Sequence, residues 1–276
     1  MRPWTRAGLA ALAVLAAGCT IQADGNGGIE VRGAFAQTRT ASDFQWQGAL
    51  APGQTVEIKG VNGAIDARPS PSGQVEVVAE RSGRRNDPEE VRIQVVQHGG
   101  GVTVCAVYPN PDGPENECVP GSGGRMRVKN NDVKVHFTVR VPAGVGFTGR
   151  TVNGGVDADN LDGTLVLVTV NGSVTFSTTG YAEATTVNGS IRGALGSSDW
   201  PDTLDFETVN GSITLDLPEG LSTTVEASTV NGSISTDFPL TVQGRFSRRR
   251  LTGTIGNGGR RLQLETVNGG ISLRKR

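Results

Sequence analysis

Seven copies of the tripeptide Val-Asn-Gly constrain the fold of this chain more than any other feature. Their asparagines are Asn62, Asn153, Asn171, Asn188, Asn210, Asn231 and Asn268. Most copies extend to Thr-Val-Asn-Gly-Ser-Ile or a close variant, and from Asn153 onward the spacings are 18, 17, 22, 21 and 37 residues. A motif that returns about every 20 residues is typical of stacked structural repeats. We interpret Leu251–Ile255 as a degenerate copy that divides the longest spacing.

The segments between the motifs alternate apolar and polar residues, as half-buried β-strands do. Leu204–Val209 is one example, and a second turn, at Gly163 or Gly180, lies about half a repeat from the neighbouring motifs. No segment after residue 40 has a helical apolar period. The sequence therefore predicts an all-β domain.

Two all-β architectures agree with this pattern. Asn-Gly between alternating segments is a strong hairpin signal, which would give an antiparallel β meander or sandwich. The near-identity of the turns favours a single-domain, β-helix-like β-solenoid with coils of 17–22 residues. Equivalent asparagines would then lie one strand spacing (~4.8 Å) apart and form a hydrogen-bonded ladder. The predicted coil corners are Asn62, Gly63, Asn153, Gly154, Asn171, Gly172, Asn188, Gly189, Asn210, Gly211, Asn231, Gly232, Asn268 and Gly269.

Residues 1–18 have the pattern of an export signal. Arg2 and Arg6 precede the uncharged apolar segment 7–17, which is too short to span a bilayer. Leu15-Ala16-Ala17-Gly18-Cys19 resembles the bacterial lipobox, so we expect lipidation at Cys19; the alternative is an ordinary signal peptide. Residues 19–40 are polar and predict a flexible tether. The protein is expected to be exported and lipid-anchored. In a Gram-negative cell it would lie at the outer membrane or face the periplasm, and in other cells it would lie at the cell surface.

Residues 65–150 interrupt the repeat with strand-like segments and long polar turns, within a domain expected to span 41–276. With Cys19 assigned to the lipid, Cys105 and Cys118 remain as a pair in an oxidising compartment, which favours a disulfide. A metal site is the alternative, but His98 and His136 lack ligand spacing. We therefore expect neither a metal nor a cofactor.

Composition excludes several classes of protein. Gly is 40 of the 276 residues, about twice the usual share, yet without a collagen period, and the apolar content is that of a globular domain. The 26 basic and 27 acidic residues are balanced, so no nucleic-acid partner is expected.

The order of motifs resembles the putative-adhesin family of bacterial β-strand-repeat domains. The resemblance covers roughly residues 40–276. It is carried by Phe44-x-Trp46-x-Gly48, the first Val-Asn-Gly, the Cys-bearing excursion, Val139-x-Val141-Pro142, the tandem Thr-Val-Asn-Gly copies and the final Leu262–Ile271. It implies a β-solenoid-like fold in an exported or envelope protein and assigns no catalytic residue.

Candidate chemistry is sparse. Asp205, Glu207, Asp216 and Glu226 alternate along strands as a polysaccharide lyase or hydrolase would need, but soluble strands show the same alternation, so no enzyme is expected. Asp157–Gly163 lacks the ligand pattern of a calcium loop. Arg248, Arg249 and Arg250 form a candidate polyanion contact, or a solvated corner that discourages edge pairing. Trp200 is a candidate exposed aromatic contact.

These observations predict a non-catalytic binding or scaffolding lipoprotein of the cell envelope. Its expected partners are the membrane, through the lipid, and a glycan or an envelope or surface protein. The alternative is an envelope-stress or signalling component that contacts membrane proteins.

Overall fold

The computed structural model describes residues 20–23, 29–32, 38–41, 43–242 and 247–276. The chain divides into two compact units, residues 1–37 and 38–276. In the first unit, β1 (Thr20–Ala23) and β2 (Ile29–Arg32) pair as an antiparallel hairpin within the predicted tether. The predicted signal segment 1–18 and Cys19 lie outside the described residues. No helix among the described residues has the length and apolar character of a membrane span.

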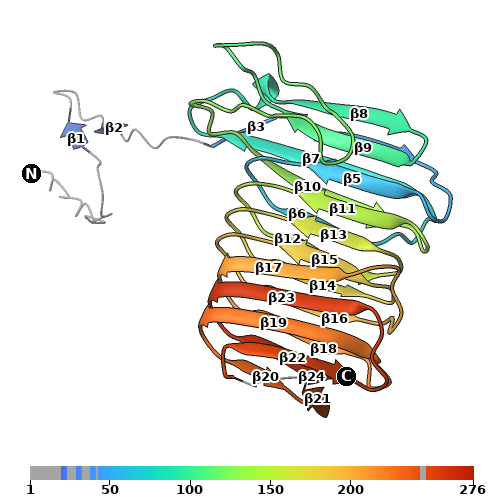
Figure 1. The fold of residues 1–276 in the computed structure, drawn as a ribbon. Helices are drawn as coiled ribbons and strands as arrows, with labels where there is room; N and C mark the ends of the chain where they lie inside the picture. Colours follow the sequence, from blue (N-terminus) through green and yellow to red (C-terminus); the bar gives the residue numbers. More distant parts are fainter. Residues whose placement is uncertain (1–19, 24–28, 33–37, 42, 243–246) are drawn as a thin grey trace, which may run out of the picture. The chain divides into compact units, whose positions relative to one another are not determined.

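The second unit consists of two long sheets that face each other (Figure 1). The first sheet contains, in spatial order, β20 (Ile234–Thr236), β24 (Ile271–Lys275), β18 (Ile213–Leu217), β16 (Ile191–Leu195), β14 (Val174–Thr178), β12 (Val156–Leu161), β6 (Ile65–Pro69), β10 (Lys134–Val141), β7 (Val75–Gly83) and β3 (Arg39–Thr40), with β4 (Phe44–Gly48) also paired to β7. The second sheet contains β21 (Leu240–Val242), β22 (Arg250–Ile255), β19 (Thr223–Asn231), β23 (Arg261–Asn268), β17 (Leu204–Asn210), β15 (Ala182–Thr185), β13 (Leu165–Val168), β11 (Gly146–Arg150), β5 (Thr55–Lys59), β9 (Gly101–Val107) and β8 (Arg92–His98). The described chain has one short 3-10 helix, η1 (Pro88–Glu90).

The central strands of both sheets pair in parallel, with equivalent residues of each repeat in register. Val156 pairs with Val174, and Val174 pairs with Ile191. Each coil contributes one strand to each sheet and then advances by one strand. The all-β, β-solenoid-like prediction is confirmed, and the antiparallel meander is excluded for the repeats.

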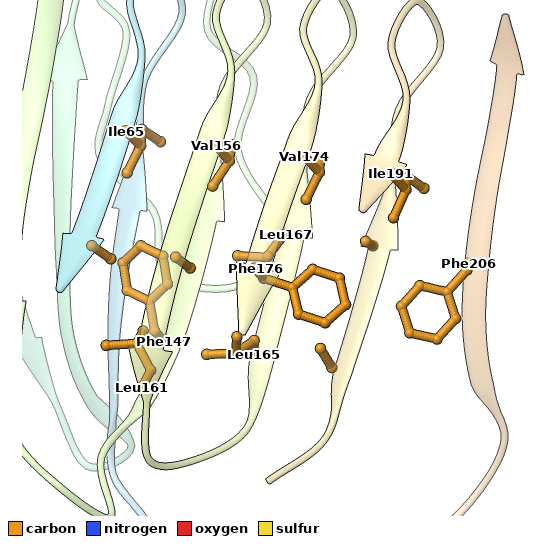
Figure 2. Packing of buried hydrophobic residues seen from close by; sticks show 14 of the residues in the cluster. Ile65, Phe147, Val156, Leu161, Leu165, Leu167, Val174, Phe176, Ile191 and Phe206 are labelled. Carbon is orange, nitrogen blue, oxygen red and sulfur yellow. The ribbon is translucent and has the colours of Figure 1, made fainter. Parts of the chain in front are cut away.

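Alternation along each strand places one side chain in two between the sheets. Figure 2 shows Ile65, Val156, Val174 and Ile191 in one inward-pointing row, and all four are buried. Further along the same core, the rings of Phe176 and Phe206 stack with centroids 6.0 Å apart. Because each coil repeats the same inward positions, the core is a continuous column of rows rather than a compact cluster.

The order of the coils in space differs from their order in the sequence at the C-terminal end. Strand β23 lies between β17 and β19, and β24 lies between β18 and β20 (Figure 1). The last coil is thus inserted between the two coils that precede it. The expectation that Leu251–Ile255 is a degenerate copy of the repeat is wrong, because β22 pairs antiparallel with β19 and, with β21 beyond it, ends the second sheet.

The region 65–150 forms the other end of the stack. Strands β10 and β11 continue the parallel sheets beside β6 and β5. Beyond them, β7 pairs antiparallel with β10, and β8 pairs antiparallel with β9. The irregular spacing in this part of the sequence therefore reflects a cap in which antiparallel strands end both sheets.

Candidate functional site

The most regular surface of the molecule is the corner at which each second-sheet strand passes to the first sheet. We call the row formed there by the seven Val-Asn pairs the Val-Asn edge. In spatial order its pairs are Val61–Asn62, Val152–Asn153, Val170–Asn171, Val187–Asn188, Val209–Asn210, Val267–Asn268 and Val230–Asn231. Six side-chain hydrogen bonds of 2.8 Å join successive asparagines, and each Nδ2 donates to the Oδ1 of the preceding asparagine in this order.

Threonine precedes six of the seven Val-Asn pairs, and it holds neighbouring coils together from inside. The hydroxyl of Thr186 is buried and donates to the carbonyl oxygen of Gly172 in the neighbouring coil, at 2.8 Å. Equivalent bonds of 2.8–3.0 Å are made by Thr151, Thr169, Thr208, Thr229 and Thr266. Threonine suits this position because its methyl group packs in the core while its hydroxyl satisfies a buried carbonyl.

The glycine after each asparagine is required by close backbone approach. A Cβ at Gly189 would lie 2.0 Å from the carbonyl oxygen of Gly172. The corresponding distance is 1.9–2.1 Å at Gly154, Gly172, Gly211, Gly232 and Gly269. Threonine, asparagine and glycine are therefore all explained by contacts within the stack.

The valine of the motif has no such internal role. Seven large apolar side chains are exposed in the described part of the chain, and five of them are Val152, Val170, Val187, Val230 and Val267. Their exposed fractions run from 36% to 55%. Val61, at the end of the row, lines a cleft of about 210 Å³ together with the exposed Val119. The Val-Asn edge is thus an apolar row beside a row of amides.

The corner is also free of charge. From the valine of the motif up to the next Val or Ile that begins a first-sheet strand, all seven copies contain only Val, Asn, Gly, Ser and Ala. The other corner of the coils differs, since it carries Asp162, Asp199, Asp202 and Glu219 in loops of unequal length. Uniformity and neutrality are therefore properties of one edge of the stack.

The arginine cluster lies at the last pair of the Val-Asn edge. The carbonyl oxygen of Arg249 accepts from the N–H of Thr229, and that of Arg248 accepts from the N–H of Ile234. The turn that carries Arg248, Arg249 and Arg250 thus runs beside the outermost corner, and all three residues are exposed. This position agrees with both interpretations of the cluster, a polyanion contact and the protection of a sheet end.

The candidate acidic residues do not converge on one point. Asp205 and Glu226 face outward on the second sheet, but Gln263 of β23 lies between them in the register. Two strand spacings separate these two positions, ~10 Å. Asp216 belongs to the first sheet. One acid that the sequence did not single out, Glu183, stands beside Asp205, and burial together with the charges of Asp205 and Asp202 raises its pKa.

The acidic segment 157–163 is used by contacts within the protein. Arg68 donates to Asp157 at 2.5 Å, and the hydroxyl of Ser177 donates to Asp159 at 2.5 Å. Among the residues that the structure describes, no group of three or more His, Cys, Asp and Glu side chains is arranged to hold a metal ion.

Cys105 and Cys118 are joined in a disulfide, with a Cα–Cα distance of 5.6 Å. The bond fastens the loop 108–133 to β9. Asn116 orders this loop, because its Nδ2 donates to the carbonyls of Tyr108 and Arg127. The hydroxyl of Tyr108 donates to the carbonyl of Val133 at 2.8 Å, and burial raises the pKa of Tyr108 to about 12. A cleft of about 660 Å³ beside the loop is lined by two ion-paired residues, Asp112 and Lys129, and by several asparagines.

Trp200 is buried rather than exposed. It retains 2% of its accessible surface, and its Nε1 donates to the carbonyl of Arg261 at 3.2 Å. Arg261 begins β23, so the inserted C-terminal coil covers this ring. The prediction of an exposed aromatic contact is therefore wrong.

Comparison with known proteins shows which family the repeats resemble. Residues 150–274 match the family described as Toastrack DUF4097. The matched range is a little under half of the chain, and it is this part that is similar to the family. The Toastrack residues include six of the seven Val-Asn pairs, and Val61–Asn62 extends the same edge beyond the matched range. The resemblance to β-strand-repeat adhesin domains is confirmed at the level of the family.

Two solved structures are similar to the chain. One is described as a putative cell adhesion protein from Clostridium sporogenes ATCC 15579, with 11% identity over 85% of this chain and 100% of that chain, and a TM-score of 0.48. The other is described as a putative adhesin from Bacteroides fragilis NCTC 9343, with 12% identity over 85% of this chain and 97% of that chain, and a TM-score of 0.34. No curated protein matches the chain.

The exposure of the valines was not predicted, although the alternation of buried and exposed residues in the sequence indicates it. Leu204, Phe206 and Thr208 are buried, so alternation along β17 directs Val209 outward. The same reasoning applies to every Thr-Val-Asn copy. The asparagines and glycines explained the repeat, and no role was predicted for the valine that points outward in each copy.

Proposed function

We propose that this protein is a non-catalytic binding or scaffolding domain that a lipid at Cys19 anchors to the bacterial cell envelope. The observation that carries this proposal is the Val-Asn edge, where the same pair recurs on seven stacked coils and five of its valines are exposed. A repeated surface offers many equivalent contacts to an extended or multivalent partner. Catalysis needs the opposite arrangement, in which different groups converge on one point.

The anchoring part of the proposal is tested by cell fractionation. Full-length protein should sediment with membranes and be extracted by detergent, whereas the Cys19→Ser variant should be found in the soluble fraction. Lipidation modifies the cysteine that becomes the N-terminus of the mature protein, so mass spectrometry of that N-terminus is an independent readout. Membrane association that is unchanged by Cys19→Ser would contradict the proposal.

The binding part concerns a glycan or an envelope or surface protein. The exposed arginines 248–250 at the end of the Val-Asn edge suit an acidic glycan, because guanidinium groups pair well with carboxylate and phosphate. The full chain should be applied to a glycan array and to whole cells, as wild type and with Arg248–Arg250 changed to Ser. The matched control changes Arg84 and Arg85, which are exposed in the N-terminal cap, to Ser.

The results separate the candidate roles. Binding that is lost only with the Arg248–Arg250 variant supports a polyanion partner. Equal binding by all three proteins excludes the arginine cluster, and co-purification with an inner-membrane protein in place of glycan binding would favour the signalling role. Depolymerisation of an acidic polysaccharide that is abolished by Asp205→Asn would overturn the non-catalytic proposal.

A further inference from the structure

We propose that the Val-Asn edge is a self-association surface, on which a second copy of this chain binds through its own Val-Asn edge about a two-fold axis. This inference rests on the proposed role of the edge as a binding surface and names its partner. It does not depend on the lipid or on the arginine cluster.

The spacing of the valines selects the partner. Successive valines along the edge lie one strand spacing apart, ~4.8 Å. Side chains on one face of a single strand repeat every ~6.6 Å, and neighbours along one face of a helix lie ~5–6 Å apart. Among regular protein elements, therefore, another stack of strands matches this row over its whole length. The Val-Asn edge of a second copy is the same row and has the same spacing, and dry packing between rows of identical side chains is found in steric zippers.

The Val-Asn edge has no charge, so two copies of it can pair without repulsion between like charges. Two copies of a charged row would place like charges together, which is destabilising at an interface. The Val-Asn edge carries no titratable group in any of its seven copies. Its apolar part also accounts for five of the seven exposed large apolar side chains in the described chain. Covering them requires no desolvation of ions.

The asparagines retain capacity to bond outward. In the ladder, Nδ2 of Asn188 uses one of its two protons on Asn171, and its Oδ1 accepts one bond from Asn210. An amide nitrogen has two donor protons and an amide oxygen has two lone pairs. Each central asparagine can therefore still donate one hydrogen bond and accept one at the surface. The asparagines of two edges can make these bonds with each other.

The symmetry follows from the order of the pairs. A two-fold pair that buries the whole edge places the fourth of the seven copies, Val187–Asn188, on the axis. Val152 of one copy then lies opposite Val267 of the other. The two asparagine ladders then run in opposite directions, and the antiparallel alignment of their amide dipoles is favourable. A parallel arrangement would instead place every residue opposite itself.

The area indicates weak association. Seven coils give a strip ~29 Å long, and the four residues Val-Asn-Gly-Ser are ~13 Å wide, so a pair buries roughly 750 Å² in total. Stable interfaces bury about 1,200–2,000 Å². We therefore expect self-association at high concentration in solution, and stronger association where copies are concentrated on a membrane.

Disulfide trapping tests the contact and its symmetry. Cysteine is introduced singly at Val187, Val152, Val267 or Val230 in full-length Cys19→Ser protein, which removes the remaining free thiol and separates this test from anchoring. Val187→Cys should form covalent dimers under mild oxidation. Val152→Cys and Val267→Cys should each form few alone and many when the two variants are mixed. Thr175→Cys, an exposed position on the neighbouring sheet face, is the control.

Equal trapping at Thr175 and Val187, or no trapping at any position on the edge, would overturn the proposal. Self-trapping at Val230 that equals that at Val187 would exclude the two-fold arrangement. Sedimentation equilibrium up to ~1 mM supplies a second readout, suited to the weak affinity expected of a small interface. Wild type and Val187→Thr should show a rising average mass, whereas Val187→Lys should remain monomeric with an unchanged melting temperature. A Val187→Lys variant that associates like wild type would contradict the proposal even if trapping succeeds.

Discussion

The hydroxyl of Thr186 donates to the carbonyl oxygen of Gly172 at 2.8 Å, and this one contact joins two neighbouring coils from inside the corner. Both residues belong to the Thr-Val-Asn-Gly motif, but to successive copies. Each of the five inner motifs therefore supplies a donor to one neighbour and an acceptor to the other. The same residues recur in the sequence because neighbouring coils make the same hydrogen bond to each other.

Replacing the hydroxyl should weaken the stack locally. Thr186→Val keeps the shape of the side chain but leaves the Gly172 carbonyl without its donor, and we expect a loss of about 1 kcal/mol in the free energy of unfolding. Thr186→Ser, which keeps the hydroxyl, should recover part of that loss. Thr185→Val, at the outward-facing neighbour on β15, is the control. Urea unfolding measures all three, and equal effects of Thr186→Val and Thr185→Val would contradict the assignment.

The glycines of the motif should tolerate substitution far less than glycines elsewhere. A Cβ at Gly189 would lie 2.0 Å from the carbonyl oxygen of Gly172, so Gly189→Ala must push two coils apart. We expect a loss of about 3 kcal/mol or more, as for severe overpacking. At Gly220 a Cβ meets nothing within 4 Å, so Gly220→Ala should leave the unfolding midpoint nearly unchanged. Similar midpoints for the two variants would refute the close approach.

The sequence predicted the asparagine ladder because the ladder depends on local identity. A corner that is repeated seven times, with Asn and Gly always together, has few explanations other than stacking at one strand spacing. The all-β class followed from the alternation in segments such as Leu204–Val209 in the same way. The ladder and the all-β class depend only on the residues within each repeat, so they can be predicted without knowing the order in which the repeats stack.

The order of the coils could not be predicted for the same reason. The motifs around Asn210, Asn231 and Asn268 offer nearly identical bonding groups, so any of them can stack on any other. The chain between the last two motifs does not form a regular coil: β22 pairs antiparallel with one side of β19 and with β21, and β23 pairs with the other side of β19. The burial of Trp200 depends on the insertion of the last coil and was missed with it.

The inserted position of the last coil can be tested by paired cysteines on the outer face of the first sheet. Thr214 pairs directly with Ser272, and Ser272 separates it from Ser235. Thr214→Cys with Ser272→Cys should form a disulfide, since neighbouring strands lie ~4.8 Å apart and the bond requires Cα atoms within ~7 Å. Thr214→Cys with Ser235→Cys, about twice that distance apart, should not. Peptide mapping reads out the pairs, and the reverse result would indicate coils stacked in sequence order.

The dependence of stability on pH should report the environment of Glu183. Burial, and then the charges of Asp205 and Asp202, raise the pKa of Glu183 in the folded protein. A carboxyl group whose pKa is raised on folding stabilises the fold below its unfolded pKa of ~4.3, and this contribution is lost as pH rises through the folded pKa. Glu183→Gln removes the charge, so its melting temperature should exceed that of wild type at about pH 7, well above the ordinary pKa. At about pH 3.5, where the unfolded chain is also largely protonated, the two proteins should melt together. Glu219→Gln, at an exposed loop position, is the matched control. A gain for Glu183→Gln that is the same at both pH values would mean that the substitution acts through packing and not through the ionisation of Glu183.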